Sequence, residues 1–236
     1  MGYSTAYLHP GKLFASQFGT IIDSSTVIRY AEFLRRESGL SDQPPIDLIP
    51  IFHHFGISIP KRIPLPGQSG LLANPDYGTI FISSDDSVTR QRFSEAHELM
   101  ELLFAAQSPV ISWSGRVRGP FSDKTKEKLC EEGAAELLMP LSTFIPYLQH
   151  MDVSLETGKR LAELYRVSLT AALLRTVRFG PGQHALVLWK LAWKPKEAEA
   201  LPPSSQLSLF DDYRPQPPPQ KLRVQWGCST QNRLFV

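Results

Sequence analysis

The segment His97-Glu98-Leu99-Met100-Glu101 lies in an apolar, helix-like run and has residue types and a spacing that suit metal chemistry. In the H-E-x-x-H arrangement, two histidines one helical turn apart bind a metal ion, and the glutamate between them acts as a general base. Here Glu98 stands in the position of the base, and Glu101 stands where the second histidine would be. The spacing predicts a metal-site helix in which one ligand is altered.

A second predicted helix, at about residues 123–139, carries Glu127 and Glu131 four residues apart on one face. Like charges at this spacing repel by about a few tenths of a kcal/mol, so a nearby cation or exposure to solvent is needed to explain them. If the two helices pack by these faces, Glu127 and Glu131 join His97 and Glu101. One nitrogen and up to three oxygens suit Zn²⁺ with water, and also a harder ion such as Mn²⁺.

A simpler interpretation of the same residues stays open. The chain has six histidines, and an H-E-x-x-E segment arises by chance in on the order of 1 in 50 chains of this composition. His97 would then be a core histidine with satisfied hydrogen bonds, and Glu101 an exposed carboxylate. Cys130, on the apolar face of the second helix, is expected to be a small packing residue.

Composition narrows the class of protein. The chain has 236 residues, of which 42% are hydrophobic, enough for one large domain or for a core domain with an appendage. A net charge of +2 is too small for the electrostatic signature of a nucleic-acid-binding protein. Two cysteines do not make a disulfide framework, and no apolar run approaches the roughly 18 residues of a membrane span. We expect a cytoplasmic protein that does not enter a membrane.

Hydrophobic periodicity and capping residues predict the elements that position the two motif helices. Between them we expect a long exposed loop that contains Trp113, and before them a loose N-terminus. The other expected elements are a helix capped by Ser24 and Ser25 and ending near Gly39, a short helix in IDLIPIFHHFG, a strand-like ISI at 57–59, a turn-rich stretch at 60–70, a strand at 79–83 and a helix at 88–106.

The C-terminal third is predicted to change from helix to strand. The segments LETGKRLAELYR and SLTAALLRTVRF have the spacing of a helix-turn-helix, and HALVLWKLAW and KLRVQW are typical of paired strands. A Pro-rich insert, 194–220, separates the strands and is expected to be a mobile loop. Because the chain stops soon after an unfinished-looking strand, we expect that the natural protein continues further.

DNA binding through the helical pair is a weaker interpretation. Arg166, Arg175 and Arg178 would then contact phosphates. Helical pairs of this kind are more often structural, and the overall charge is low, so we regard DNA as an unlikely partner.

The sequences of these segments resemble the corresponding segments of the ImmA/IrrE family of metallopeptidases. RQRFSEAHELMELLF is similar to the family's RxRFTxAHELGHxLxH segment, and EKLCEEGAAELLMP to its ExxxNxxAAELLMP helix. IDLIPIFHHFGISI is similar to VDLxxLAxxLGIxV, and the resemblance spans roughly residues 25–180. It implies an α+β fold with a zincin-like metallopeptidase core of helices packed on a small β-sheet, at 1–140, and a helix-turn-helix-like pair at 141–180. The strand pattern that follows predicts a C-terminal β segment at 181–236.

Carried over by position, the resemblance implies that His97 is the first metal ligand, Glu98 the general base, Glu101 the altered second ligand and Glu127 the third. Glu131 is the alternative third ligand. The metal would be Zn²⁺, or else Mn²⁺ or another divalent ion. Replacing a neutral imidazole by a carboxylate lowers the net charge of such a site by one unit, which weakens its Lewis acidity.

Two functions follow from the resemblance. The first is a metal-dependent endopeptidase that acts on a protein partner such as a helix-turn-helix repressor or an antitoxin. The alternative is a catalytically weakened or inactive protease-like regulator that binds such a partner without cleavage, as the altered residue Glu101 would permit.

Overall fold

A computed structural model describes residues 6–20, 22–107, 110–111, 117–118, 122–194 and 219–230. The chain divides into two compact units, Met1–Leu173 and Leu174–Val236, and each is described by itself. The helices are α1 (Pro10–Phe18), α2 (Ser24–Glu37), α3 (Ile49–His54), α4 (Val88–Ala105), α5 (Asp123–Leu138), α6 (Leu141–Gln149), α7 (Leu155–Tyr165) and α8 (Leu169–Phe179). The strands are β1 (Lys61–Ile63), β2 (Gly70–Asn74), β3 (Thr79–Ser83), β4 (Val110–Ile111), β5 (Val117–Arg118), β6 (Ala185–Ala192) and β7 (Lys221–Ser229), and a 3₁₀ turn spans Pro75–Tyr77. The predicted α+β class is confirmed.

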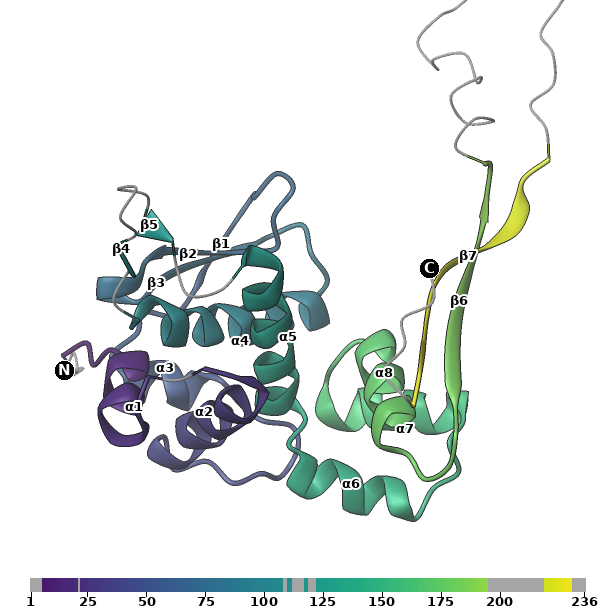
Figure 1. Cartoon of the computed structure of the whole chain (residues 1–236), viewed down its shortest axis with the longest axis horizontal. Helices are drawn as coiled ribbons and strands as arrows, with labels where there is room; N and C mark the ends of the chain where they lie inside the picture. Colours follow the sequence, from purple (N-terminus) through teal and green to yellow (C-terminus); the bar gives the residue numbers. More distant parts are fainter. Residues whose placement is uncertain are drawn as a thin grey trace, which may run out of the picture. The chain divides into compact units, whose positions relative to one another are not determined.

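A three-stranded sheet in the order β1-β3-β2 covers one side of α4, and α1 and α2 pack on the other side (Figure 1). Strand β1 runs parallel to β3, and β2 runs antiparallel to it. Ile80 and Ile82 of β3 are both buried, as their alternation predicts. The helix that carries the motif is therefore the central element of this unit.

Helix α4 begins where the sequence predicts, because the hydroxyl of Ser87 accepts a hydrogen bond from the backbone N–H of Arg90. From Ser94 to Leu103 every residue of the helix is buried or half-buried. Side chains on all sides of this segment therefore need partners, whether they are apolar or charged.

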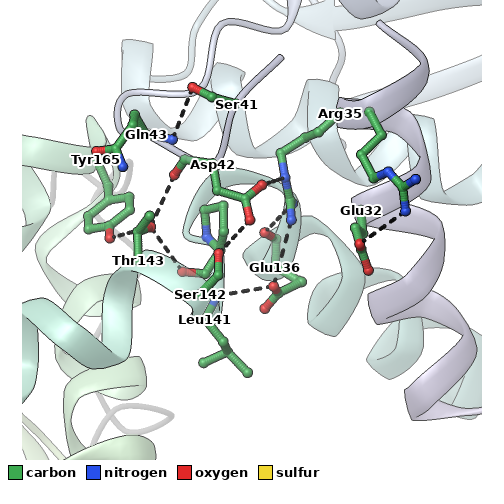
Figure 2. A network of polar contacts seen from close by, with 12 residues as sticks. Glu32, Arg35, Ser41, Asp42, Gln43, Glu136, Leu141, Ser142, Thr143 and Tyr165 are labelled. Carbon is green, nitrogen blue, oxygen red and sulfur yellow. Dashed lines mark hydrogen bonds and ion pairs between the residues drawn. The ribbon is translucent and has the colours of Figure 1, made fainter. Parts of the chain in front are cut away.

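A buried polar network joins α2, α5 and α6 (Figure 2). The side chain of Arg35 is 2% exposed; its Nε donates to Asp42 Oδ1 at 2.7 Å and its Nη1 donates to the backbone oxygen of Glu136 at 2.9 Å. The carboxylate of Glu136 in turn accepts from the backbone N–H of Leu141 at 3.0 Å, at the start of α6. Thr143 then donates to the backbone oxygen of Asp42. The network fixes the C-terminal half of α5 against α2.

Several predictions about individual elements were wrong. Asp23, and not Ser24 or Ser25, caps α2, because its carboxylate accepts from the backbone N–H of Thr26. Residues 57–59 are not a strand, and the turn-rich stretch at 60–70 instead contains β1 and the start of β2. The strand β1 has only three residues and is flanked by prolines, so its alternation carries little signal.

The loose N-terminus is in fact helix α1, which packs on α4. A Cβ atom on Gly11 would lie 2.1 Å from the backbone oxygen of Leu102, so glycine permits this close approach. Phe14 is buried and its ring meets that of Tyr30 edge-on at 5.2 Å. Helix α6 was also missed, because Pro146 inside it removes a backbone donor and weakens the helical pattern.

The second unit contains the predicted strand pair. Strands β6 and β7 run antiparallel, with Ala185 opposite Ser229 and Trp189 opposite Val224. Arg175, one of the three arginines considered for DNA contact, is 7% exposed, and its guanidinium lies over the ring of Phe179 at 5.2 Å. Arg175 is therefore not available to a phosphate, which contradicts its part in that interpretation.

Some predictions fall outside the described residues or remain predictions. Most of the Pro-rich insert at 194–220 and the Trp113 loop lie outside the part of the chain that the structure describes. The domain limits near residues 140 and 180 remain predictions. Among the helices in the described ranges, none has the length and apolar character needed to cross a membrane.

Replacing Arg35 with alanine would leave Asp42 and Glu136 without their buried cation. We expect Arg35→Ala to lower the free energy of unfolding by about 3–5 kcal/mol in urea titrations. The matched control is Arg36→Ala, whose side chain is 76% exposed and pairs with Glu32 one turn away; we expect a loss below about 1 kcal/mol. Equal losses for the two variants would contradict a structural role for the network.

Candidate metal centre

The faces of α4 and α5 meet as the sequence predicts, and they bring three of the predicted ligands together. His97 Nε2 lies 3.9 Å from Glu101 Oε1 on the same helix and 3.4 Å from Glu127 Oε2 across the interface. The side chains of His97 and Glu101 are 16% and 14% exposed, whereas that of Glu127 is 59% exposed. The cluster is therefore buried on the α4 side and open to solvent at Glu127.

Glu131, the alternative third ligand, lies one turn further along α5 and is exposed. The contact with His97 is made by Glu127. The geometry favours Glu127 over Glu131, and the assignment of either residue as a ligand remains a prediction.

Lys126 is part of the cluster and was not identified from the sequence. Its ammonium group forms an ion pair with Glu101 Oε2. Burial opposes the charged form of Lys126, but the hydrogen bond and the attraction to Glu101 outweigh it and raise the pKa of the lysine. The predicted need for a cation near Glu127 and Glu131 was the available signal. Lys126 directly precedes Glu127, but the carboxylate with which it pairs is Glu101.

Cys130, which is expected to be a small packing residue, is buried as that prediction requires and also lies in the cluster. It is fully buried, and its Sγ donates a hydrogen bond to Glu101 Oε1 at 3.5 Å. Burial, followed by the negative charge of Glu101, raises the pKa of the thiol. The two oxygens of Glu101 therefore have different neighbours: Oε2 contacts Lys126, and Oε1 faces His97 and Cys130.

Glu98 points toward the sheet and is 6% exposed. Its carboxylate accepts a hydrogen bond from the backbone N–H of Leu72 in β2, and a Cβ atom on Gly70 would lie 2.6 Å from Glu98 Oε1. Burial, followed by the negative charge of Glu101, raises the pKa of Glu98 to about 7. A carboxyl group with this pKa can accept and release a proton near neutral pH.

The donors fit a divalent metal ion. Ligand atoms at bond lengths of about 2.0–2.1 Å in a tetrahedral site lie about 3.3 Å apart. The 3.4 Å between His97 and Glu127 agrees with that spacing, and the 3.9 Å between His97 and Glu101 requires a small movement. His97, Glu101 and Cys130 each offer a ligand atom within 4.8 Å of the others.

Lys126 changes the expected charge of the site. Two imidazoles and one carboxylate carry a single negative charge, and His97, Glu101, Glu127 and Lys126 together carry the same charge. The loss of one unit expected from Glu101 alone is offset by the neighbouring ammonium group. Outer partners of this kind orient and tune metal ligands.

Comparison with known proteins identifies the family of this chain. The family described as the IrrE N-terminal-like domain matches residues 54–176, just over half of the chain, including both motif helices. The chain therefore belongs to the ImmA/IrrE family of metallopeptidases, and its α+β fold is of the predicted zincin-like class.

Two curated relatives agree with this assignment. The radiation response metalloprotease IrrE of Deinococcus deserti is 35% identical over 111 residues, which cover 45% of this chain and 38% of that protein. The protein of the same name from Deinococcus radiodurans is 31% identical over 117 residues, which cover 48% of this chain and 34% of that protein. The chain thus matches less than two fifths of the length of these relatives.

The raised pKa of Glu98 predicts a pH-dependent cost to folding in the metal-free protein. The unfolded chain loses this proton near pH 4.5 and the folded chain near pH 7, so stability falls as the pH rises through that window. We expect Glu98→Gln, measured by urea unfolding with a chelator present, to become more stable than wild type above pH 7 by at most about 3 kcal/mol. The gain should shrink toward pH 5.

The control for this measurement is Glu131→Gln, at an exposed carboxylate on α5. Its stability relative to wild type should vary little over the same pH range. A Glu98→Gln difference that does not change with pH would contradict the raised pKa.

Proposed function

We propose that the protein is a metal-dependent endopeptidase that acts on a protein partner. The observation that carries the proposal is the convergence of His97, Glu101 and Glu127 beside the buried carboxyl of Glu98. Membership in a family of metallopeptidases supports the same function. In this proposal His97, Glu101 and Glu127 hold the metal, with Zn²⁺ as the first choice and Mn²⁺ as the alternative.

When bound, the metal supplies Lewis-acid activation of the attacking water and of the peptide carbonyl. Glu98 holds and moves the proton. As a general base it accepts a proton from the water at a carboxylate oxygen, and as the conjugate acid it returns this proton to the leaving amine. The hydrogen bond from Leu72 orients Glu98, and Gly70 leaves room for its carboxylate.

The partner is a protein in this proposal, and a helix-turn-helix repressor or an antitoxin is the candidate that the family resemblance supports. The two curated relatives are described as radiation response metalloproteases. We therefore propose that this chain cleaves a regulatory protein in the cytoplasm.

One observation favours a second candidate function. The ion pair with Lys126 already satisfies the carboxylate of Glu101. A chain that keeps this pair could bind its partner without a metal ion and without cleavage. Stoichiometric partner binding by a metal-free protein would support this regulator, whereas metal-dependent cleavage would exclude it.

The role of Glu98 is tested with the full chain loaded with Zn²⁺ and incubated with a peptide library prepared from a proteome. We expect new peptide termini with wild type and a loss of roughly 100-fold or more in cleavage rate with Glu98→Gln. Zinc content should be the same for both proteins, because Glu98 is not a ligand. Cleavage by Glu98→Gln at the wild-type rate would refute the proposed base.

The choice of third ligand is tested by comparing Glu127→Gln with Glu131→Gln. Both substitutions remove one negative charge from the same helix, four residues apart. We expect Glu127→Gln to weaken Zn²⁺ binding roughly 10-fold or more, and Glu131→Gln to change it less than about twofold, in chelator competition. The opposite order would assign Glu131 as the ligand.

A further inference from the structure

We infer that Cys130 is a ligand of the metal and adds a sulfur donor to the nitrogen of His97 and the carboxylate oxygen Oε1 of Glu101. The inference rests on the proposed metal site and extends it by one residue that the H-E-x-x-H pattern does not contain. A sulfur ligand implies that the metal is an ion that accepts thiolate, such as Zn²⁺.

The spacing of the donor atoms fits a metal ion bonded to both sulfur and oxygen. A metal bonded to sulfur at about 2.3 Å and to oxygen at about 2.0 Å in a tetrahedral site holds the two atoms about 3.5 Å apart. Cys130 Sγ lies 3.5 Å from Glu101 Oε1, and both lie within 4.8 Å of a ring nitrogen of His97. Cys130 is also three residues after Glu127, so the two side chains share a face of α5.

The burial of the donor side chains also supports Cys130 as a ligand. Cys130 is 0% exposed, and His97 and Glu101 are nearly as well buried, whereas Glu127 is 59% exposed. The three inner donors are fixed by helix packing, and Glu127 is the donor that can leave the metal without unpacking the helices. A cysteine that only fills space would be expected among apolar groups, but this thiol contacts the oxygen of Glu101 that also faces His97.

The charge balance of the metal-loaded cluster also supports a thiolate ligand. When the metal–sulfur bond forms, the thiol of Cys130 loses its proton to the solvent and the sulfur becomes anionic. The thiolate and the carboxylates of Glu101 and Glu127 then carry three negative charges, and a divalent ion together with Lys126 carries three positive charges. The ammonium of Lys126 leaves the loaded cluster neutral, which favours its burial.

Sulfur also distinguishes between the candidate metals. Thiolate is a soft ligand that suits Zn²⁺, whereas Mn²⁺ prefers carboxylate, carbonyl and water oxygens. With Cys130 in the ligand set, the site should therefore select Zn²⁺ over Mn²⁺. A site of one imidazole and two carboxylates would show a weaker preference for Zn²⁺.

The test uses the full chain after chelator treatment, titrated with Zn²⁺ and, as a spectroscopic probe, with Co²⁺. Because the chain has only two cysteines, Cys228→Ser is the matched control for Cys130→Ser. For wild type and Cys228→Ser we expect X-ray absorption to report one sulfur at about 2.3 Å from zinc, and cobalt to show sulfur-to-metal charge-transfer absorption. For Cys130→Ser we expect both signals to disappear and Zn²⁺ affinity to fall roughly 10- to 100-fold.

The outcomes separate this inference from the proposed function. A wild-type zinc shell of nitrogen and oxygen only, with unchanged affinity in Cys130→Ser, overturns the sulfur ligand and leaves the proposed endopeptidase standing. Failure of the wild type to bind either ion overturns both. If Cys130→Ser does not fold, the absorption spectra of wild type and Cys228→Ser still decide, because thiolate sulfur at about 2.3 Å in the metal shell of Cys228→Ser can come only from Cys130.

Discussion

Helix α4 buries carboxylates as well as leucines, and each carboxylate needs a partner from a different element. Glu95 pairs with Arg62 of β1, Glu98 accepts the backbone N–H of Leu72 in β2, and Glu101 pairs with Lys126 of α5. An unpaired buried carboxylate would cost several kcal/mol, so these contacts specify how the sheet and α5 pack on α4. The fold and the candidate site depend on the same set of charges.

This constraint explains how a carboxylate is tolerated at position 101, where the H-E-x-x-H pattern has a histidine. The carboxylate of Glu101 adds a negative charge where an imidazole would add none, and Lys126 restores the balance from outside the ligand set. Because Lys126 contacts Oε2, the other oxygen of Glu101 stays directed at His97 and Cys130. Glu101 and Lys126 therefore form one electrostatic unit.

The sequence predicted the two motif helices and the polar face of each, because helical periodicity places His97 with Glu101 and Glu127 with Glu131. It did not predict the neighbours that come from other elements. In the sequence, Lys126 is one of several charged residues in an exposed helical turn. Its contact with Glu101 depends on the packing angle of two helices. Strand β1 was missed because it is short, and helix α1 was missed although His9 caps it and Pro10 begins it, because the close packing that explains Gly11 is a long-range contact. Local patterns report which face a residue occupies, and long-range packing decides what it meets.

We propose that Glu101 binds metal through Oε1 while Lys126 holds Oε2. A crystal structure of the zinc-loaded protein, with anomalous scattering measured on both sides of the zinc absorption edge, tests this directly. We predict an anomalous peak between α4 and α5, bonded to His97 Nε2 and Glu101 Oε1, with the ammonium of Lys126 still on Oε2. A peak elsewhere, or Glu101 turned away from His97, would contradict it.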